Sequence, residues 1–163
     1  KVSLQRFVLS VLLDDVLIQA SYRLNIMSKG RYQLVRKEDR AKGNKASGLE
    51  LEVEDGDTGK PRSVATLSGG ESFMAALSLA LGLSDVVQSY AGGIKLDTLF
   101  IDEGFGSLDM ESLDAAIRVL MDLQASGRMI GIISHVTELK DQMANRIDVI
   151  SSRIGSSIKT IAA

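Results

Sequence analysis

Two short polar stretches carry residue types and spacings that suggest chemistry. The first is LSGGE at residues 67–71, where Ser68, Gly69 and Gly70 can turn the chain tightly and expose backbone N–H groups at the start of a helix. Such an arrangement binds phosphate. The same residues also suit a simple turn with a helix cap, because serine is a good N-cap and glycine tolerates positive φ. The stretch alone leaves both explanations open.

The second stretch is an acidic pair, Asp102 and Glu103, at the end of the apolar run 96–101. Two adjacent carboxylates at the end of a buried strand repel each other and lose solvation, which a cation or a hydrogen-bonding network relieves. We expect Asp102 to hold Mg²⁺ through water, and Glu103 to be the base that polarises a water aimed at a terminal phosphate. The alternative is a solvated strand end.

Two more features follow along the chain. Residues 106–109 include Ser107 and Asp109, and Asp109 either caps the helix that begins near residue 111 or contacts another subunit. His135 is the only histidine and follows the apolar run 129–133. A lone histidine is more often structural, but this one is expected at the same end of a parallel sheet as the acidic pair, where ligands bind. It could donate a hydrogen bond to a terminal phosphate.

One part of a nucleotide site is missing from the sequence. The phosphate-binding lysine loop has the pattern G-x-x-x-x-G-K-[ST]. Its nearest candidate is Gly59 followed by Lys60, but Glu54 stands where the first glycine belongs and Pro61 replaces the serine or threonine. The chain is therefore not expected to form a complete nucleotide site by itself.

The composition is that of an ordinary globular protein. The 163 residues fit one domain, with 45% apolar and 25% charged residues. The net charge of −2 gives no bulk basic footprint for nucleic acid, and the lack of cysteine excludes disulfides and thiolate metal sites. No apolar run is expected to span a membrane. The chain begins at Lys1 without a signal-peptide pattern, so we expect a segment of a longer protein.

Hydrophobic periodicity predicts a layered α/β fold. Residues 1–28 are predicted to form a helix that is apolar on two faces. Such a helix lies either in the core or at the edge of a domain. Strand and helix then alternate in the second half, which predicts parallel central strands. One face of the first helix carries Leu4, Phe7, Val8, Val11 and Ile18, and the other carries Leu13, Leu17 and Leu24. The other expected elements are strands at 30–36 and 49–54 around a polar stretch at 37–48, a turn at 55–59, helices at 70–90, 111–125 and 136–144, and strands at 96–101, 129–133, 147–151 and 158–161.

Taken in order, these motifs resemble the C-terminal half of an ABC-type ATPase head. Residues 67–71 resemble the signature motif, 96–103 the Walker B strand with its catalytic glutamate, 106–109 the D-loop, and His135 the switch histidine. Heads split by a coiled coil are typical of the SMC, RecN and SbcC families. The motif sequences are most similar to those of SbcC. The similar segments are MSKGRY at 27–32, TLSGGESF at 66–73, FIDEGFGSLD at 100–109 and GIISHV at 131–136.

The resemblance implies an architecture and a function. It implies the C-terminal lobe of a P-loop NTPase head, with a central mostly parallel sheet, a small antiparallel hairpin, a returning coiled-coil base helix at 1–28 and the lobe at 29–163. Ser68, Gly69, Gly70 and Glu71 would face the ATP of an opposite subunit, whereas Asp102, Glu103 and His135 would act on their own subunit's ATP.

The implied cofactors are ATP and Mg²⁺. The implied partners are the N-terminal half of the same protein, a second copy, the SbcD nuclease and double-stranded DNA, with a cytoplasmic, nucleoid-associated location and no membrane. The first alternative is an SMC-like or RecN-like head that tethers DNA without a nuclease. The others are a transporter nucleotide domain and a degenerate lobe without hydrolysis, against which Glu103 argues.

Overall fold

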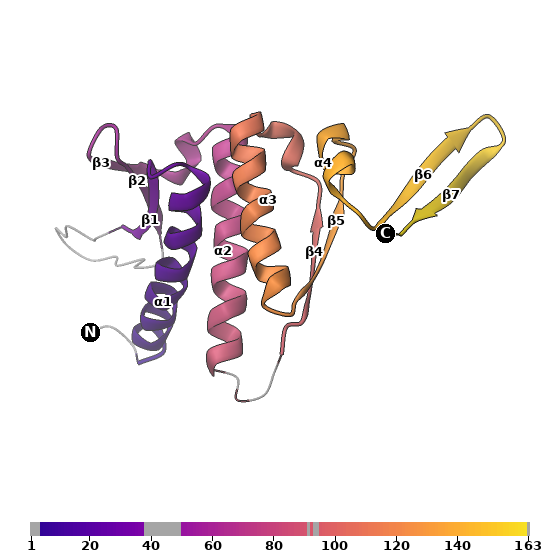
Figure 1. Cartoon of the computed structure of the whole chain (residues 1–163). Coiled ribbons are helices and arrows are strands. Elements are labelled where there is room, and N and C mark those ends of the chain that lie inside the picture. The colour runs from indigo at the N-terminus through magenta and orange to yellow at the C-terminus, as the bar shows by residue number, and fades with distance from the viewer. Residues whose placement is uncertain (1–3, 38–49, 91, 93–94, 163) are drawn as a thin grey trace.

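Three long helices lie between two sheets in the computed structural model, which describes residues 4–37, 50–90, 92 and 95–162 (Figure 1). An antiparallel sheet lies on the α1 side and a parallel strand pair on the other. The helices are α1 (Leu4–Met27), α2 (Gly69–Tyr90) and α3 (Met110–Ala125). The predicted α/β class is thus confirmed.

Helix α1 is apolar on two faces, as the sequence predicts, and only one face is buried. Leu17, Ala20 and Leu24 belong to the core, whereas Phe7 is 60% exposed and Ile18 is 65% exposed. The helix therefore lies at the edge of the core. The side chain of Leu4 falls outside the described part.

Helix α1 ends because the chain turns into left-handed conformations. Lys29 has φ of 56° and Gly30 has φ of 85°, and the Gly30 N–H donates to the carbonyl of Asn25 at 2.7 Å. This is a common way for helices to stop. The chain then runs back along α1, where the Ser21 hydroxyl donates to the carbonyl of Leu34 and accepts from its N–H, both at 2.9 Å. The helix thus covers the edge of the first strand.

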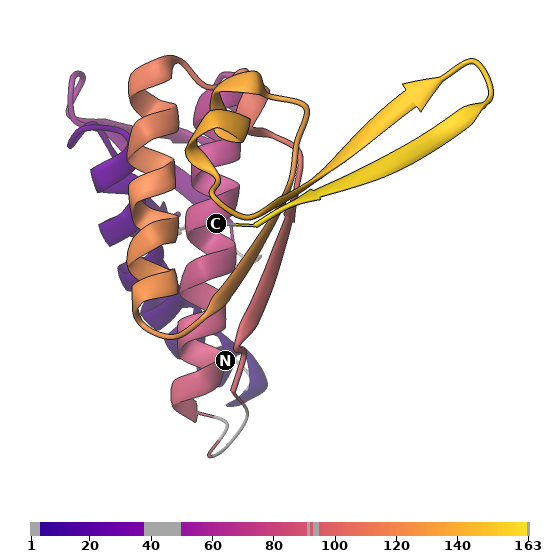
Figure 2. The same cartoon turned by 45° about the vertical axis from the view of Figure 1, so that its right-hand side comes forward.

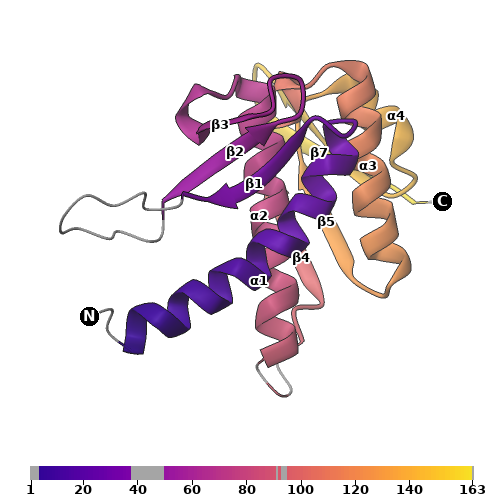
Figure 3. The ribbon, with the colours of Figure 1, turned by 90° about the vertical axis from the view of Figure 1, so that its left-hand side faces the viewer.

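The antiparallel sheet has one strand more than the sequence predicts (Figure 3). Its strands β1 (Tyr32–Arg36), β2 (Leu51–Asp55) and β3 (Lys60–Ser63) pair in chain order. Pro61 concealed β3 from sequence reasoning, but proline is tolerated at a sheet edge. Most of the polar stretch at 37–48 lies outside the described residues.

Helix α2 packs tightly against α1. A side chain at Gly82 would place its Cβ 2.7 Å from the carbonyl oxygen of Val16, so only glycine allows this approach. Asp85, farther along α2, pairs with Arg23 of α1 at 2.5 Å and with Arg128 at 2.7 Å. These half-buried ion pairs join α2 to α1 and to the turn before the strand β5 (Met129–Ile133).

By length and composition alone, α2 could cross a membrane. It has 22 residues and a mean hydropathy of 1.3 in its most apolar window. The expectation that no apolar segment reaches this length is therefore wrong for α2 on these measures. The helix lies in the core between α1 and α3, and core helices pass the same test.

The strands β4 (Thr98–Asp102) and β5 (Met129–Ile133) form the predicted parallel pair, joined through α3. The prediction that both are buried is wrong: Phe100 is 68% exposed and Met129 is 60% exposed. Among the described residues only these two strands pair in this sheet, so their outer face has no cover. In α3 the apolar residues Leu113, Ile117, Leu120 and Leu123 are buried, whereas Met121 is 47% exposed.

The C-terminal segment forms a short helix and a long hairpin. Helix α4 (Thr137–Gln142) follows β5, and β6 (Arg146–Ser152) pairs with β7 (Gly155–Ile161) in an antiparallel hairpin longer than the predicted strands. The hairpin projects from the rest of the molecule (Figures 1 and 2). Its apolar residues, such as Val149 at 71% and Ile158 at 72%, are exposed.

Candidate functional site

Ser68 and Glu71 form a capping box at the start of α2. The Ser68 N–H donates to Oε2 of Glu71 at 2.8 Å, and the Glu71 N–H donates to Oγ of Ser68 at 3.4 Å. This reciprocal arrangement holds a helix start in one geometry. The capping explanation therefore applies, and it is compatible with anion binding because the first N–H groups of a helix have no partner within it.

The other oxygen of Glu71 is held from the antiparallel sheet. The Tyr32 hydroxyl donates to Oε1 of Glu71 at 2.6 Å and accepts from Nη2 of Arg62 at 3.2 Å. The hydrogen bond from Tyr32 lowers the pKa of Glu71 below its ordinary 4.5. Burial, followed by this hydrogen bond, raises the pKa of Tyr32. Glu71 is thus a carboxylate with both oxygens occupied.

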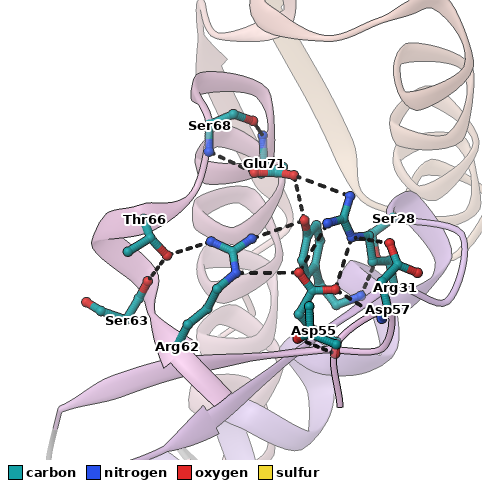
Figure 4. A network of polar contacts seen from close by, with 11 residues as sticks. Ser28, Arg31, Asp55, Asp57, Arg62, Ser63, Thr66, Ser68 and Glu71 are labelled. Atoms are coloured by element: carbon teal, nitrogen blue, oxygen red, sulfur yellow. Dashed lines mark hydrogen bonds and ion pairs between the residues drawn. The ribbon is translucent and has the colours of Figure 1, made fainter. Parts of the chain in front are cut away.

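A buried carboxylate anchors this network (Figure 4). Asp55 is 2% exposed and accepts two hydrogen bonds from Arg31, both at 3.1 Å. The hydrogen bond from Arg31 lowers the pKa of Asp55. Arg62 lies 3.5 Å from the same carboxylate. Asp55 therefore fixes both arginines that flank the Tyr32 ring.

The D-loop segment packs directly against the start of α2. A Cβ on Gly70 would lie 2.6 Å from the carbonyl oxygen of Ser107, so the two backbones touch. Phe105 meets Phe73 edge to face, with ring centroids 4.9 Å apart. The structure thus brings the signature residues and the D-loop together.

Asp109 caps α3. Its Oδ1 accepts from the N–H of Ser112 at 2.7 Å, and this hydrogen bond lowers the pKa of Asp109. The capping alternative for Asp109 is confirmed. A contact with another subunit stays a prediction.

Glu103 and His135 meet at the carboxyl ends of β4 and β5. Nδ1 of His135 lies 2.9 Å from Oε2 of Glu103, and the side chains are 80% and 48% exposed, respectively. The Glu103 N–H donates to the carbonyl of Ile133 at 2.8 Å, which joins the two strand ends. Glu103 has φ of 61°, an uncommon conformation for a residue other than glycine, and such conformations concentrate at functional sites.

Asp102 lies beside this pair and is exposed. The described residues contain no group of three or more histidine, aspartate or glutamate side chains that could hold a metal by themselves. A single exposed carboxylate suits Mg²⁺, which keeps several waters and binds through one or two carboxylates and substrate phosphates. The donor set therefore fits a water-mediated role for Asp102 and does not form a dedicated metal cage.

The histidine also faces the D-loop. A groove of about 440 Å³ runs between the segment 105–113 and the residues 135–138. A Cβ on Gly106 would lie 3.8 Å from Nε2 of His135. The D-loop thus borders both the signature residues and the Glu103–His135 pair.

Sequence reasoning missed the residues that support Glu71. It used Tyr32 only as part of the predicted strand 30–36 and of the SbcC-like segment 27–32, and Asp55 only as part of a turn. The serine-to-glutamate spacing at 68 and 71 does signal a capping box. Nothing in the sequence pairs Glu71 with Tyr32, because β1 and α2 meet only in the fold.

Comparison with known proteins finds relatives that match this chain in sequence. The family model SbcC/RAD50-like, Walker B motif, matches residues 44–122. The C subunit of the SbcCD nuclease from Vibrio cholerae serotype O1 is 73% identical over 161 residues, which are 99% of this chain and 16% of that protein. The chain is thus similar to SbcC/RAD50-like proteins over nearly its whole length. The protein of the same name from Staphylococcus epidermidis is 51% identical over 96% of this chain and 15% of its own length, so the chain spans a small part of these relatives.

The fold also has relatives among solved structures. One, from work on ATP-driven dimerization and DNA-stimulated activation of SMC ATPases, has a TM-score of 0.70 and covers 96% of this chain and 89% of its own. Its sequence identity is 14%. This likeness concerns the fold alone and identifies it as that of an SMC-type ATPase head.

Proposed function

We propose that this chain is the C-terminal half of an SbcC-type ATPase head, and that the full protein hydrolyses ATP between two copies of itself. The supporting observation is the Glu103–His135 pair, 2.9 Å apart at the ends of parallel strands, in a chain that lacks a phosphate-binding lysine loop. Residues 1–28 form the returning coiled-coil base and 29–163 the lobe. The N-terminal half of the same protein supplies the lysine loop.

In this proposal Glu103 polarises the water that attacks the terminal phosphate, as a general base. Nδ1 of His135 faces Glu103, so Nε2 is the ring nitrogen that could face a phosphate oxygen. Asp102 holds Mg²⁺ through water, and the metal neutralises phosphate charge when it is bound. Ser68, Gly69 and Gly70 contact the ATP held by the opposite subunit.

The proposed partners beyond the second copy are the SbcD nuclease and double-stranded DNA. The exposed apolar face of α1, which includes Val11 at 43% and Ile18 at 65%, offers a docking surface for the nuclease. Replacing Val11 and Ile18 with glutamate should prevent co-purification of the nuclease, and intact binding would refute this docking site. We further propose a cytoplasmic, nucleoid-associated protein without a membrane partner.

The test of the ATPase proposal uses the full-length protein. Ser68→Arg should abolish ATP-dependent dimerisation, measured by analytical ultracentrifugation, and should spare ATP binding to the monomer because the signature is outside that monomer's own pocket. Loss of ATP binding to the monomer, or undisturbed dimerisation, would refute the assignment. The isolated 163 residues should show no steady-state hydrolysis, and measurable turnover would refute the half-site.

A second candidate, a head that tethers DNA without a nuclease, is compatible with the shared fold, but the similarity to SbcCD nuclease subunits supports the first proposal more strongly. Purification of the full-length protein from its native source distinguishes the two. A co-purifying metal-dependent nuclease supports the first proposal, and its absence under gentle conditions supports the second.

A further inference from the structure

Glu71 is the acidic residue of the first turn of α2, and its position is set from two directions. One oxygen accepts from the Ser68 N–H at 2.8 Å, and the other accepts from the Tyr32 hydroxyl at 2.6 Å. Its side chain is 23% exposed. Glu71 thus connects the Tyr32 hydroxyl to the backbone N–H of Ser68. Contacts that fix the Tyr32 hydroxyl therefore also help to fix Ser68.

Tyr32 is itself held firmly. It is 2% exposed, and the guanidinium carbons of Arg31 and Arg62 lie 4.8 and 5.5 Å from its ring centroid. Arg62 also donates to the Tyr32 hydroxyl at 3.2 Å and to Oγ1 of Thr66 at 2.5 Å. Because Arg62 occupies the hydroxyl's acceptor side, the hydroxyl proton is directed to Glu71.

We propose that Tyr32 is a positioning residue for the signature motif. Through Glu71 it fixes Ser68 in the orientation that meets the ATP of the opposite subunit, so the β1–β3 sheet helps set the competence of the head to dimerise. The inference rests on the proposed function. The route from the Tyr32 hydroxyl that ends in a hydrogen bond to the Ser68 backbone runs through Glu71, so loss of the hydroxyl should affect dimer closure and leave ATP binding to the monomer unchanged.

The test variant is Tyr32→Phe in the full-length protein, which keeps the ring and removes the hydroxyl. Its matched control is Tyr90→Phe, since the Tyr90 hydroxyl also donates to a carboxylate, that of Asp15 at 2.7 Å, but at the other end of α2. Dimerisation with ATP is measured by analytical ultracentrifugation in a Glu103→Gln background. Affinity of the monomer for a fluorescent ATP analogue is measured in a Ser68→Arg background.

We expect Tyr32→Phe to weaken the ATP-dependent dimer about tenfold, the loss typical of one hydrogen bond to a charged group. Monomer affinity should not change, and Tyr90→Phe should change neither quantity. Glu71→Ala is a second variant that removes the shared acceptor. In that background Tyr32→Phe should cause no further loss, because the route through Glu71 is already broken.

Three results would overturn the proposal: wild-type dimerisation of Tyr32→Phe, an equal loss of monomer affinity, or an undiminished loss in the Glu71→Ala background. Failure of the proposed function gives a different pattern. In that case the parent protein does not dimerise with ATP, or Ser68→Arg does not prevent it, and both proposals are refuted. If the parent behaves as proposed and only the Tyr32→Phe results fail, the inference alone is wrong.

Discussion

The two candidate sites of this chain are built to different degrees. At the start of α2, Glu71 has partners for both oxygens inside the chain, and the supporting Asp55 is buried. At the ends of β4 and β5, Glu103 and His135 contact each other and are 48% and 80% exposed. The carboxylate at the start of α2 is held entirely by groups of this chain, whereas the Glu103–His135 pair is exposed to solvent.

The proposed function accounts for this difference. A surface that receives a nucleotide from another subunit gains affinity when it is ordered beforehand, because less freedom is lost on binding. A hydrolytic site needs phosphate ligands and a dry cavity, which the described residues do not provide. The apolar outer face of the β4–β5 pair is exposed, and the Phe100 side chain is 68% exposed. An exposed apolar face of this kind indicates that further protein covers it.

The largest expected effect is on the Glu103–His135 pair. Glu103→Gln in the full-length protein should lower ATP hydrolysis by about 10²–10⁴-fold, the usual contribution of a general base. The ATP-bound dimer should persist, since the signature end is untouched. Steady-state phosphate release and ultracentrifugation measure the two quantities. Asp122→Asn, an exposed change on α3, is the control, and a hydrolysis rate near wild type for Glu103→Gln would contradict the assignment.

The second effect concerns the ion pairs of Asp85, which join α2 to α1 and to the turn before β5, away from both candidate sites. Asp85→Asn leaves Arg23 and Arg128, which are 13% and 16% exposed at the side chain, without a counter-charge. We expect local destabilisation of about 2–3 kcal/mol, somewhat below the loss for fully buried pairs. Hydrogen exchange of α2 and β5 amides measures it.

The control for this change is Asp14→Asn, which breaks an exposed pair with Arg36. It should change local stability by less than about 1 kcal/mol. Equal exchange in the two variants would show that the Asp85 ion pairs do not stabilise the packing of α2 against α1 and the start of β5.

The elements with strong periodicity could be predicted from the sequence. The helix predicted at 70–90 is α2 (Gly69–Tyr90), and the helix predicted at 111–125 is α3 (Met110–Ala125), because long apolar stripes are unambiguous. Burial of β4 and β5 could not be predicted correctly. Apolar strands indicate a sheet with other elements packed on both faces. Here none of the described residues packs on the outer face of β4 and β5.

The site was predictable to a similar degree. The closeness of Glu103 and His135 followed from strand ends in a parallel sheet, and the structure has them 2.9 Å apart. The support of the signature motif was not predictable. In the sequence Asp55 belongs to a turn-like cluster and Tyr32 to a predicted strand. Only the fold brings the Tyr32 hydroxyl to Glu71, and Asp55 to the arginines beside Tyr32.

The third effect tests the contact between the D-loop and the signature helix. Gly70→Ala would place a Cβ 2.6 Å from the Ser107 carbonyl, whereas at Gly69 the nearest atom, Cβ of Ser107, is 3.8 Å away. Gly70→Ala should destabilise this contact by about 1–2 kcal/mol through overpacking. Gly69→Ala should be neutral or slightly stabilising because alanine favours helix. Hydrogen exchange of the first turn of α2 distinguishes them, and equal behaviour would show that the contact is loose.

The smallest effect is a pH dependence confined to the signature end. The pKa of Glu71 lies below its ordinary 4.5, so its contribution to local stability is present above about pH 4.5 and is lost as pH falls through the folded-state pKa. The pKa of Tyr32 lies above its ordinary 10.0, so its contribution is present below pH 10 and is lost as pH rises beyond it. Hydrogen exchange of α2's first turn, corrected for intrinsic rates, should therefore be slowest between these limits. In Glu71→Gln the loss of protection at low pH should vanish. If protection still falls at low pH in this variant, another group is responsible for that pH dependence.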